Sequence, residues 1–209
     1  MAPLILPPSD LPGRARLEIV RPGTLLQRIH LARFGSTEFN PTVPSAVSGG
    51  RFDTTDGRYA YLYAASHLEA AVAEAFLPAT SMALGKALLP KRALQGRVLS
   101  ILRTTEEVAL LSLHGSGLAM VGADQNLTMC DADGYPVSRL WAGELREWVH
   151  DAQGFVWRSR RDNDHFCYVF FSDRCHSLEA VGDPVDLDDP TWTPVVLSIL
   201  RSYNVSVDA

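Results

Sequence analysis

The segment Gly49–Phe76, GGRFDTTDGRYAYLYAASHLEAAVAEAF, concentrates the residues of this chain that could do chemistry. It places Arg51 after two glycines, continues through a tyrosine-rich stretch, and ends in an alanine-rich stretch that contains Glu74. A guanidinium binds phosphate groups through planar, paired donors. A carboxylate stabilises the positive charge that develops on a sugar when its glycosidic bond breaks. An arginine, aromatic rings and a carboxylate at one site would therefore suit chemistry on a nucleotide sugar.

Glu74 belongs to a predicted helix. Apolar residues recur there at helical spacing, which predicts a face directed towards the core, and they are Leu68, Ala71, Val72, Ala75 and Phe76. Ser66, with Glu69 three residues later, predicts a capping box at the helix start. The neighbours of Glu74 on its own face are also apolar, and a buried carboxylate needs a partner. The alternative is that Glu74 points into water at the edge of a short helix.

Three tyrosines precede this helix at alternate positions, Tyr59, Tyr61 and Tyr63. Alternation places them on one face of a predicted strand. They could contact a ligand there, or form an aromatic ladder of the kind that β-sheets favour in any case. Before them, the turn-forming loop Asp53–Gly57 follows the pair Gly49–Gly50, whose glycines would let the backbone approach a ligand closely.

An earlier strand is predicted at Leu25–Leu31. It contains Arg28 and His30, and the i, i+2 spacing puts both side chains on one face, so His30 could face the same pocket as Arg28. The sequence has no CxxC or HExxH pattern, and its histidines lack a paired acid at ligand spacing. We therefore predict no metal site.

These residues, in this order, resemble the RES domain family, which is named after its arginine, glutamate and serine. The arginine of the family's early strand matches Arg28. The family block G-G-R-[WF]-N matches Gly49–Phe52, followed by Asp53 where asparagine is usual. The family strand end, V-Y-A-A/S, matches Leu62–Ser66.

The remaining matches lie in the helix and in a later strand. The family's helical glutamate matches Glu74, and its serine matches Ser159 in the segment Gly154–Arg160, GFVWRSR. The resemblance therefore runs from about Arg28 to about Phe171, which is most of the chain.

The resemblance implies an α+β single domain similar to the ADP-ribosyltransferase fold, with a mixed β-sheet core and flanking helices. It implies cleavage of the nicotinamide–ribose bond of NAD+ by phosphorolysis or hydrolysis, and a role as the toxin of a bacterial toxin–antitoxin pair. NAD+ is then a substrate, no cofactor is needed, and inorganic phosphate is the candidate co-substrate. Two alternatives stay open: ADP-ribosyl transfer to a protein, and an inactive relative that binds a partner.

The resemblance also implies roles for the matching residues. The catalytic residues expected are Arg28, Glu74 and Ser159. The substrate-binding residues expected are Arg51, Tyr63, Tyr61 and His30. Arg28 and Arg51 would bind phosphate or pyrophosphate, while Glu74 would hold the ribose. Tyr63 would stack on nicotinamide and Ser159 would position a reacting group. If there is no ligand site, the arginines form surface ion pairs, Tyr63 packs in the core, and Ser159 is a solvated strand position.

Global properties agree with one soluble cytoplasmic enzyme. The chain has 209 residues, of which 46% are hydrophobic and 21% charged, enough for a single core. A net charge of -5 argues against a nucleic-acid binder. No apolar run approaches the length of a membrane span, and the N-terminus lacks the basic lead of a signal peptide. The three widely spaced cysteines are consistent with reduced thiols.

We divide the chain into a proline-rich N-terminal arm, residues 1–20, and a RES-like domain, residues 21–209. The other elements predicted are a strand at Arg97–Arg103, a helix at Val137–Val149, paired strands at Phe155–Arg158 and Phe166–Phe171, and a helix at Pro194–Tyr203. The acidic, polar segment Asp183–Asp189 separates the last strand from the last helix.

The partners expected are NAD+ and a protein antitoxin that covers the active site, and a homodimer is also compatible with the sequence. The long loop Phe34–Ser48 carries apolar residues that a partner could cover, namely Phe34, Phe39, Val43 and Val47.

Overall fold

The computed structural model describes residues 4–41, 49–77 and 87–208. The strands in these ranges are β1 (Leu17–Val20), β2 (Leu25–Leu31), β3 (Tyr61–Ala65), β4 (Ala87–Leu89), β5 (Arg97–Thr104), β6 (Val108–Ser112), β7 (Gly154–Arg158), β8 (Phe166–Phe171), β9 (Leu178–Asp186) and β10 (Val205–Val207). The helices are α1 (Leu68–Phe76), α2 (Ser116–Met120), α3 (Asn126–Met129), α4 (Tyr135–Trp148) and α5 (Thr193–Ser202), with short 3-10 helices η3 (Lys91–Ala93) and η4 (Ala132–Gly134).

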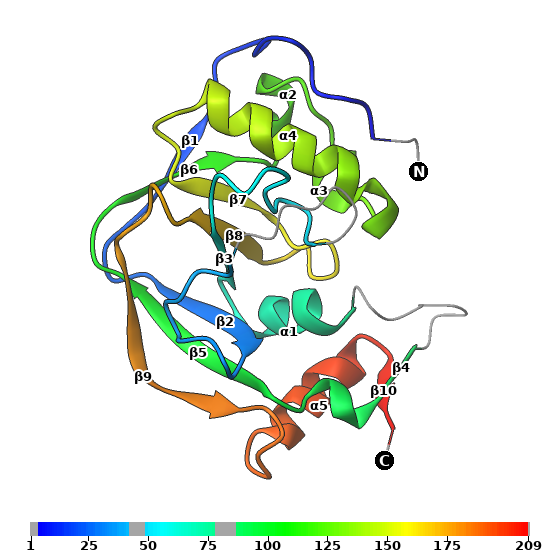
Figure 1. The fold of residues 1–209 in the computed structure, drawn as a ribbon. Coiled ribbons are helices and arrows are strands. Elements are labelled where there is room, and N and C mark those ends of the chain that lie inside the picture. Colours follow the sequence, from blue (N-terminus) through cyan, green and yellow to red (C-terminus); the bar gives the residue numbers. More distant parts are fainter. Residues whose placement is uncertain (1–3, 42–48, 78–86, 209) are drawn as a thin grey trace.

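An eight-stranded mixed sheet forms the centre of the molecule, in the order β1-β6-β7-β8-β3-β2-β5-β9 (Figure 1). Its neighbouring strands run antiparallel except β6 and β7, which run parallel. Two short parallel strands, β10 and β4, form a second sheet.

The large sheet opens between β2 and β3. β2 pairs with β5 from Leu25 to Leu31, whereas it pairs with β3 only at Gln27 and Ala65. The two strands therefore diverge beyond that point, and side chains on both of them can face the space between.

Helices cover the two halves of the sheet separately (Figure 1). Helix α4 packs on the half that contains β6, β7 and β8, with Trp141 and Leu145 fully buried. Helices α1 and α5 pack together on the half that contains β2 and β5, through Val72 and Leu200 among others. A third apolar cluster fills the opposite side of the sheet. The opening between β2 and β3 thus lies where the two helix-covered halves meet.

The element predictions from sequence are largely confirmed. The strand at Leu25–Leu31 is β2, and the strand at Arg97 continues to Thr104. The helix predicted from Val137 begins at Tyr135, with Pro136 in its first turn. The paired strands are β7 and β8, which are antiparallel neighbours, and the last helix is α5.

Three expectations from the sequence differ from the structure. Helix α1 begins at Leu68 without a side-chain cap, because the Ser66 hydroxyl accepts a hydrogen bond from Phe166 N instead. The acidic segment after residue 183 continues strand β9, an edge strand with many exposed positions. Residues 17–20, at the end of the predicted arm, form edge strand β1.

Part of the long loop, residues 42–48, lies outside the described residues, as do Val43 and Val47. Among the residues that are described, no helix is both long and apolar enough to cross a bilayer. Within the same ranges, no group of three or more His, Cys, Asp or Glu side chains is arranged to hold a metal ion.

Candidate functional site

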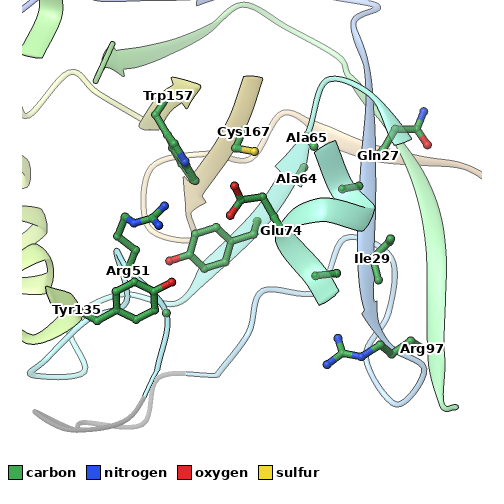
Figure 2. A pocket seen from close by; sticks show the side chains of 14 residues that line it. Gln27, Ile29, Arg51, Ala64, Ala65, Glu74, Arg97, Tyr135, Trp157 and Cys167 are labelled. Carbon is green, nitrogen blue, oxygen red and sulfur yellow. The ribbon is translucent and has the colours of Figure 1, made fainter. Parts of the chain in front are cut away.

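A cavity of about 220 Å³ lies at the opening between β2 and β3. Residues from both strands, from helix α1 and from the loop that follows Gly49 line it. Figure 2 shows the Glu74 carboxylate near its middle, with Arg51 and Tyr135 to one side and Arg97 to the other.

Glu74 enters the cavity from α1, and its neighbours hold one of its two oxygens. The Oε1 atom accepts hydrogen bonds from Ser159 Oγ at 2.7 Å and from Arg160 N at 3.0 Å. Among the described residues no donor binds Oε2. The carboxylate is therefore oriented by two donors through one oxygen, while the other remains able to bind a ligand.

Ser159 is fully buried and does not face water. Its Oγ donates to Glu74 and accepts a hydrogen bond from Asp162 N at 3.2 Å. The solvated-strand alternative is thus wrong for Ser159, and its direct contact is with the carboxylate.

Arg51 is buried beside the same carboxylate. Its Nη2 donates to the Cys130 carbonyl at 3.2 Å, and its Cζ lies 5.4 Å from the centre of the Tyr135 ring. Burial opposes the charge, but Coulombic attraction to Glu74 and the interactions with Cys130 outweigh it, so the pKa of Arg51 is raised. Its Nε is buried without a hydrogen-bond partner among the described residues. Arg51 therefore brings a permanent positive charge to the cavity wall.

Asp53 holds the loop that carries Arg51. Its carboxylate accepts hydrogen bonds from Gly50 N at 2.5 Å and from Tyr63 Oη at 2.8 Å. Tyr63 Oη in turn accepts from Phe52 N at 3.0 Å. Burial, followed by Asp53, raises the pKa of Tyr63 well above its ordinary value, so the phenol stays protonated. The Tyr63 ring lines the cavity while its hydroxyl fixes the loop.

Trp157 and Cys167 complete the wall next to Glu74 (Figure 2). The Trp157 ring meets the Tyr63 ring edge-on, with centroids 6.2 Å apart. Burial, and then the Glu74 carboxylate, raise the pKa of the Cys167 thiol well above its ordinary value. The thiol is therefore neutral, and Cys167 is not a thiolate nucleophile.

Comparison with protein-family models identifies the family of this chain. The model described as "RES domain" matches residues 25–193, which is most of the chain. The chain belongs to the RES domain family.

Among solved structures, this RES protein is similar to a chain in the crystal structure of the M. tuberculosis MbcT–MbcA toxin–antitoxin complex. The two are 17% identical, the match covers 85% of this chain and 91% of that one, and the TM-score is 0.58. The likeness confirms the α+β, ADP-ribosyltransferase-like fold that we predicted from the sequence. No protein with a curated description matches the chain.

Arg28, which we matched to the arginine of the RES family, does not line the cavity. Strand alternation puts Arg28 and His30 on the face of β2 opposite to Gln27 and Ile29, which line it. Arg28 is almost completely buried, and its guanidinium donates to Ser36 O at 2.7 Å and to Gly35 O at 3.4 Å. Burial lowers the pKa of Arg28 to about 10, although nearby Glu38 opposes that change. In this position Arg28 anchors the loop that follows β2.

His30 belongs to the same buried network as Arg28. Its Nε2 lies 2.8 Å from Ser100 Oγ, which donates to Ser36 Oγ at 2.9 Å. Burial, followed by the Arg28 charge, lowers the pKa of His30, which favours a neutral ring. The expectation that both residues share a face is confirmed, but that face is not the one that lines the cavity.

Tyr61 packs edge-on against Tyr63, with centroids 5.4 Å apart, and is not among the residues that line the cavity. Of the predicted site residues, the cavity is lined by Arg51, Tyr63 and Glu74, with Ser159 behind Glu74.

Sequence reasoning missed four residues at this site, and these are Arg97, Tyr135, Trp157 and Arg160. Trp157 could have been found, because it precedes Ser159 by two positions and alternation puts both on one side of the strand. Arg160 shares the Cys130 carbonyl with Arg51, donating to it from Nη1 at 3.2 Å, and it also pairs with Asp131.

Proposed function

We propose that this protein cleaves the nicotinamide–ribose bond of NAD+. The observation that carries the proposal is the state of Glu74: Oε1 accepts two hydrogen bonds, while Oε2 lies in a cavity beside a buried guanidinium and two aromatic rings. A carboxylate held in this way is suited to binding ribose hydroxyls and to stabilising positive charge on the sugar.

The residues of the cavity have complementary roles in such a reaction. As the C1′–N bond breaks, its electron pair leaves with neutral nicotinamide, and the ribose becomes oxocarbenium-like. Glu74 stabilises that charge, and Ser159 keeps its carboxylate in place. The rings of Tyr63 and Trp157 offer faces or edges to the nicotinamide, and Arg51 binds phosphate. An oxygen of water or inorganic phosphate then forms the new bond to C1′. When water is the nucleophile, its proton is released to solvent.

We further propose that the protein is the toxin of a bacterial toxin–antitoxin pair and acts in the cytoplasm. Membership of the RES family and the fold shared with a chain of the MbcT–MbcA complex support this role. The partner would be a protein antitoxin that covers the cavity. Phe39 does not line the cavity and packs, partly buried, against the apolar cluster on the opposite side of the sheet.

The proposal is tested by incubating purified protein with NAD+, with and without phosphate, and separating the products by chromatography. Free ADP-ribose identifies hydrolysis, and phosphorylated ADP-ribose identifies phosphorolysis. Labelling of an added protein would identify ADP-ribosyl transfer instead. Unchanged NAD+ under every condition contradicts the proposed function and favours an inactive relative.

A further inference from the structure

Arg97 lies at the end of the cavity away from Arg51, with Glu74 between the two arginines (Figure 2). It is the first residue of β5, where it stands opposite Leu31 of β2. Within residues 4–41, 49–77 and 87–208, its guanidinium has no carboxylate partner and no hydrogen-bond acceptor. The contact it does make is with an aromatic ring: its Cζ lies 5.6 Å from the centre of Phe76.

Arg97 differs from two arginines nearby in sequence or fold that have a carboxylate partner. Arg103, on the same strand, pairs with Glu179, and Arg146 pairs with Asp173. Arg97 is partly buried, and burial alone lowers its pKa, with no carboxylate close enough to oppose the effect. The donors of a partly buried guanidinium that has no acceptor in the protein can bind an acceptor that a ligand supplies.

The surroundings of Arg97 prepare its planar guanidinium for an anion that accepts two hydrogen bonds. The Phe76 ring restricts the guanidinium, and ring contacts of this kind leave the N–H donors at the edge of the plane free. The donors face a cavity whose nearby wall, formed by Ile29 and Ala75, is apolar. Phosphate oxygens match the fork of an arginine better than they match a single ammonium group.

We propose that Arg97 is a second phosphate-binding residue of this cavity, so that the site binds anionic groups on both sides of Glu74. The proposal rests on the proposed function and deepens it by assigning a phosphate contact in addition to that of Arg51. The phosphate has two potential sources with the same chemistry, the pyrophosphate of the dinucleotide and free inorganic phosphate.

Binding is measured first, without turnover, by titrating inorganic phosphate and pyrophosphate separately into wild-type protein, Arg97→Gln and Arg103→Gln. Loss of a charged hydrogen-bond donor should weaken binding by about 10- to 100-fold in Arg97→Gln. Arg103→Gln is the matched control, because this arginine lies on the same strand but pairs with Glu179 outside the cavity. Equal affinity in wild type and Arg97→Gln overturns the proposal, as does a wild type that binds neither anion.

Arg97→Lys is the second variant if Arg97→Gln does not fold. It keeps the charge but loses the planar fork and the ring contact, so we expect weaker phosphate binding with normal thermal stability. Wild-type affinity in Arg97→Lys would contradict a bidentate contact and overturn the proposal in its stated form.

Steady-state kinetics then identify the source of the phosphate. If Arg97 binds the dinucleotide, Arg97→Gln raises the KM for NAD+ and leaves the KM for phosphate unchanged. If it binds free phosphate, the reverse is expected, and a change in neither constant overturns the proposal. A wild type that binds the anions but does not consume NAD+ contradicts the proposed function alone, since the titrations require no turnover.

Discussion

Ser159 Oγ donates a hydrogen bond to Glu74 Oε1 over 2.7 Å and so joins two residues 85 positions apart in the chain. Ser159 follows strand β7, Glu74 lies on α1, and β8 and β3 connect the two across the sheet. The two residues that we matched to the glutamate and serine of the RES family are thus hydrogen-bonded to each other. Their contact uses Glu74 Oε1 and leaves Oε2 able to bind a ligand in the cavity.

Replacing Glu74 by Gln should abolish NAD+ cleavage while keeping the fold. Glutamine retains a carbonyl oxygen that can accept the bonds from Ser159 and Arg160, but it lacks the charge that stabilises an oxocarbenium-like ribose. Removal of one such electrostatic contact lowers kcat by about 100-fold or more. Turnover of NAD+ and thermal unfolding measure the two effects. Glu69→Gln, on the exposed face of the same helix, is the control and should keep full activity.

Replacing Gly50 by Ala should disturb the loop that holds Arg51. A Cβ at this position would lie 2.9 Å from Asp53 Oδ1 and 3.1 Å from Tyr63 Oη. The Asp53 carboxylate would have to move and would lose hydrogen bonds worth about 1 kcal/mol each. We therefore expect a lower unfolding temperature and a higher KM for NAD+.

Gly143→Ala is the matched control for this change. Gly143 lies within α4, and a Cβ there meets no atom within 4 Å. The same substitution should therefore stabilise the protein slightly, by up to about 1 kcal/mol, because alanine favours helix more than glycine does. If Gly50→Ala behaved like Gly143→Ala, the loop would not depend on the Asp53–Tyr63 contact.

Replacing Arg28 by Ala distinguishes an anchoring role from a catalytic one. The structure gives Arg28 hydrogen bonds to the carbonyls of Gly35 and Ser36, and none of these residues lines the cavity. Its removal deletes these hydrogen bonds and leaves a cavity where the buried side chain packed, which costs on the order of 2–4 kcal/mol of unfolding free energy. We expect a lower urea midpoint and an unchanged kcat per folded molecule. A large fall in kcat with normal stability would instead restore the catalytic assignment implied by the family resemblance.

Arg28 also marks the limit of what the sequence could predict. Alternation correctly put Arg28 and His30 on one face of β2, but it could not say which face meets the cavity. That depends on where β2 separates from β3, and only Gln27 and Ala65 pair across them. Arg97 was missed for the same reason, since it reaches the cavity through the pairing of β5 with β2.

Hydrophobic sequence patterns predicted helices and strands best where the side chains are buried. The apolar face of α1 predicted the helix, and the apolar runs of β7 and β8 predicted their pairing. Edge strands β1 and β9 gave little signal, because many of their residues are exposed and polar side chains interrupt the alternation. The contact between Glu74 and Ser159 joins distant segments. The sequence placed the two residues at one site only through the family resemblance and did not predict their hydrogen bond.

Expression of the wild-type protein alone should arrest growth of a bacterial host and lower its intracellular NAD+. The reason is that Arg51, Tyr63 and Glu74 line one cavity, and the proposed antitoxin would be needed to restrain their activity. Growth and NAD+ are measured after induction, with Glu74→Gln as the inactive protein and Glu69→Gln as the active control. Co-expression of the neighbouring gene should restore both growth and NAD+ if that gene encodes the antitoxin. Normal growth and unchanged NAD+ on expression of soluble wild-type protein would contradict the toxin role. Growth arrest by Glu74→Gln as well as by wild type would show that the toxicity does not come from NAD+ cleavage.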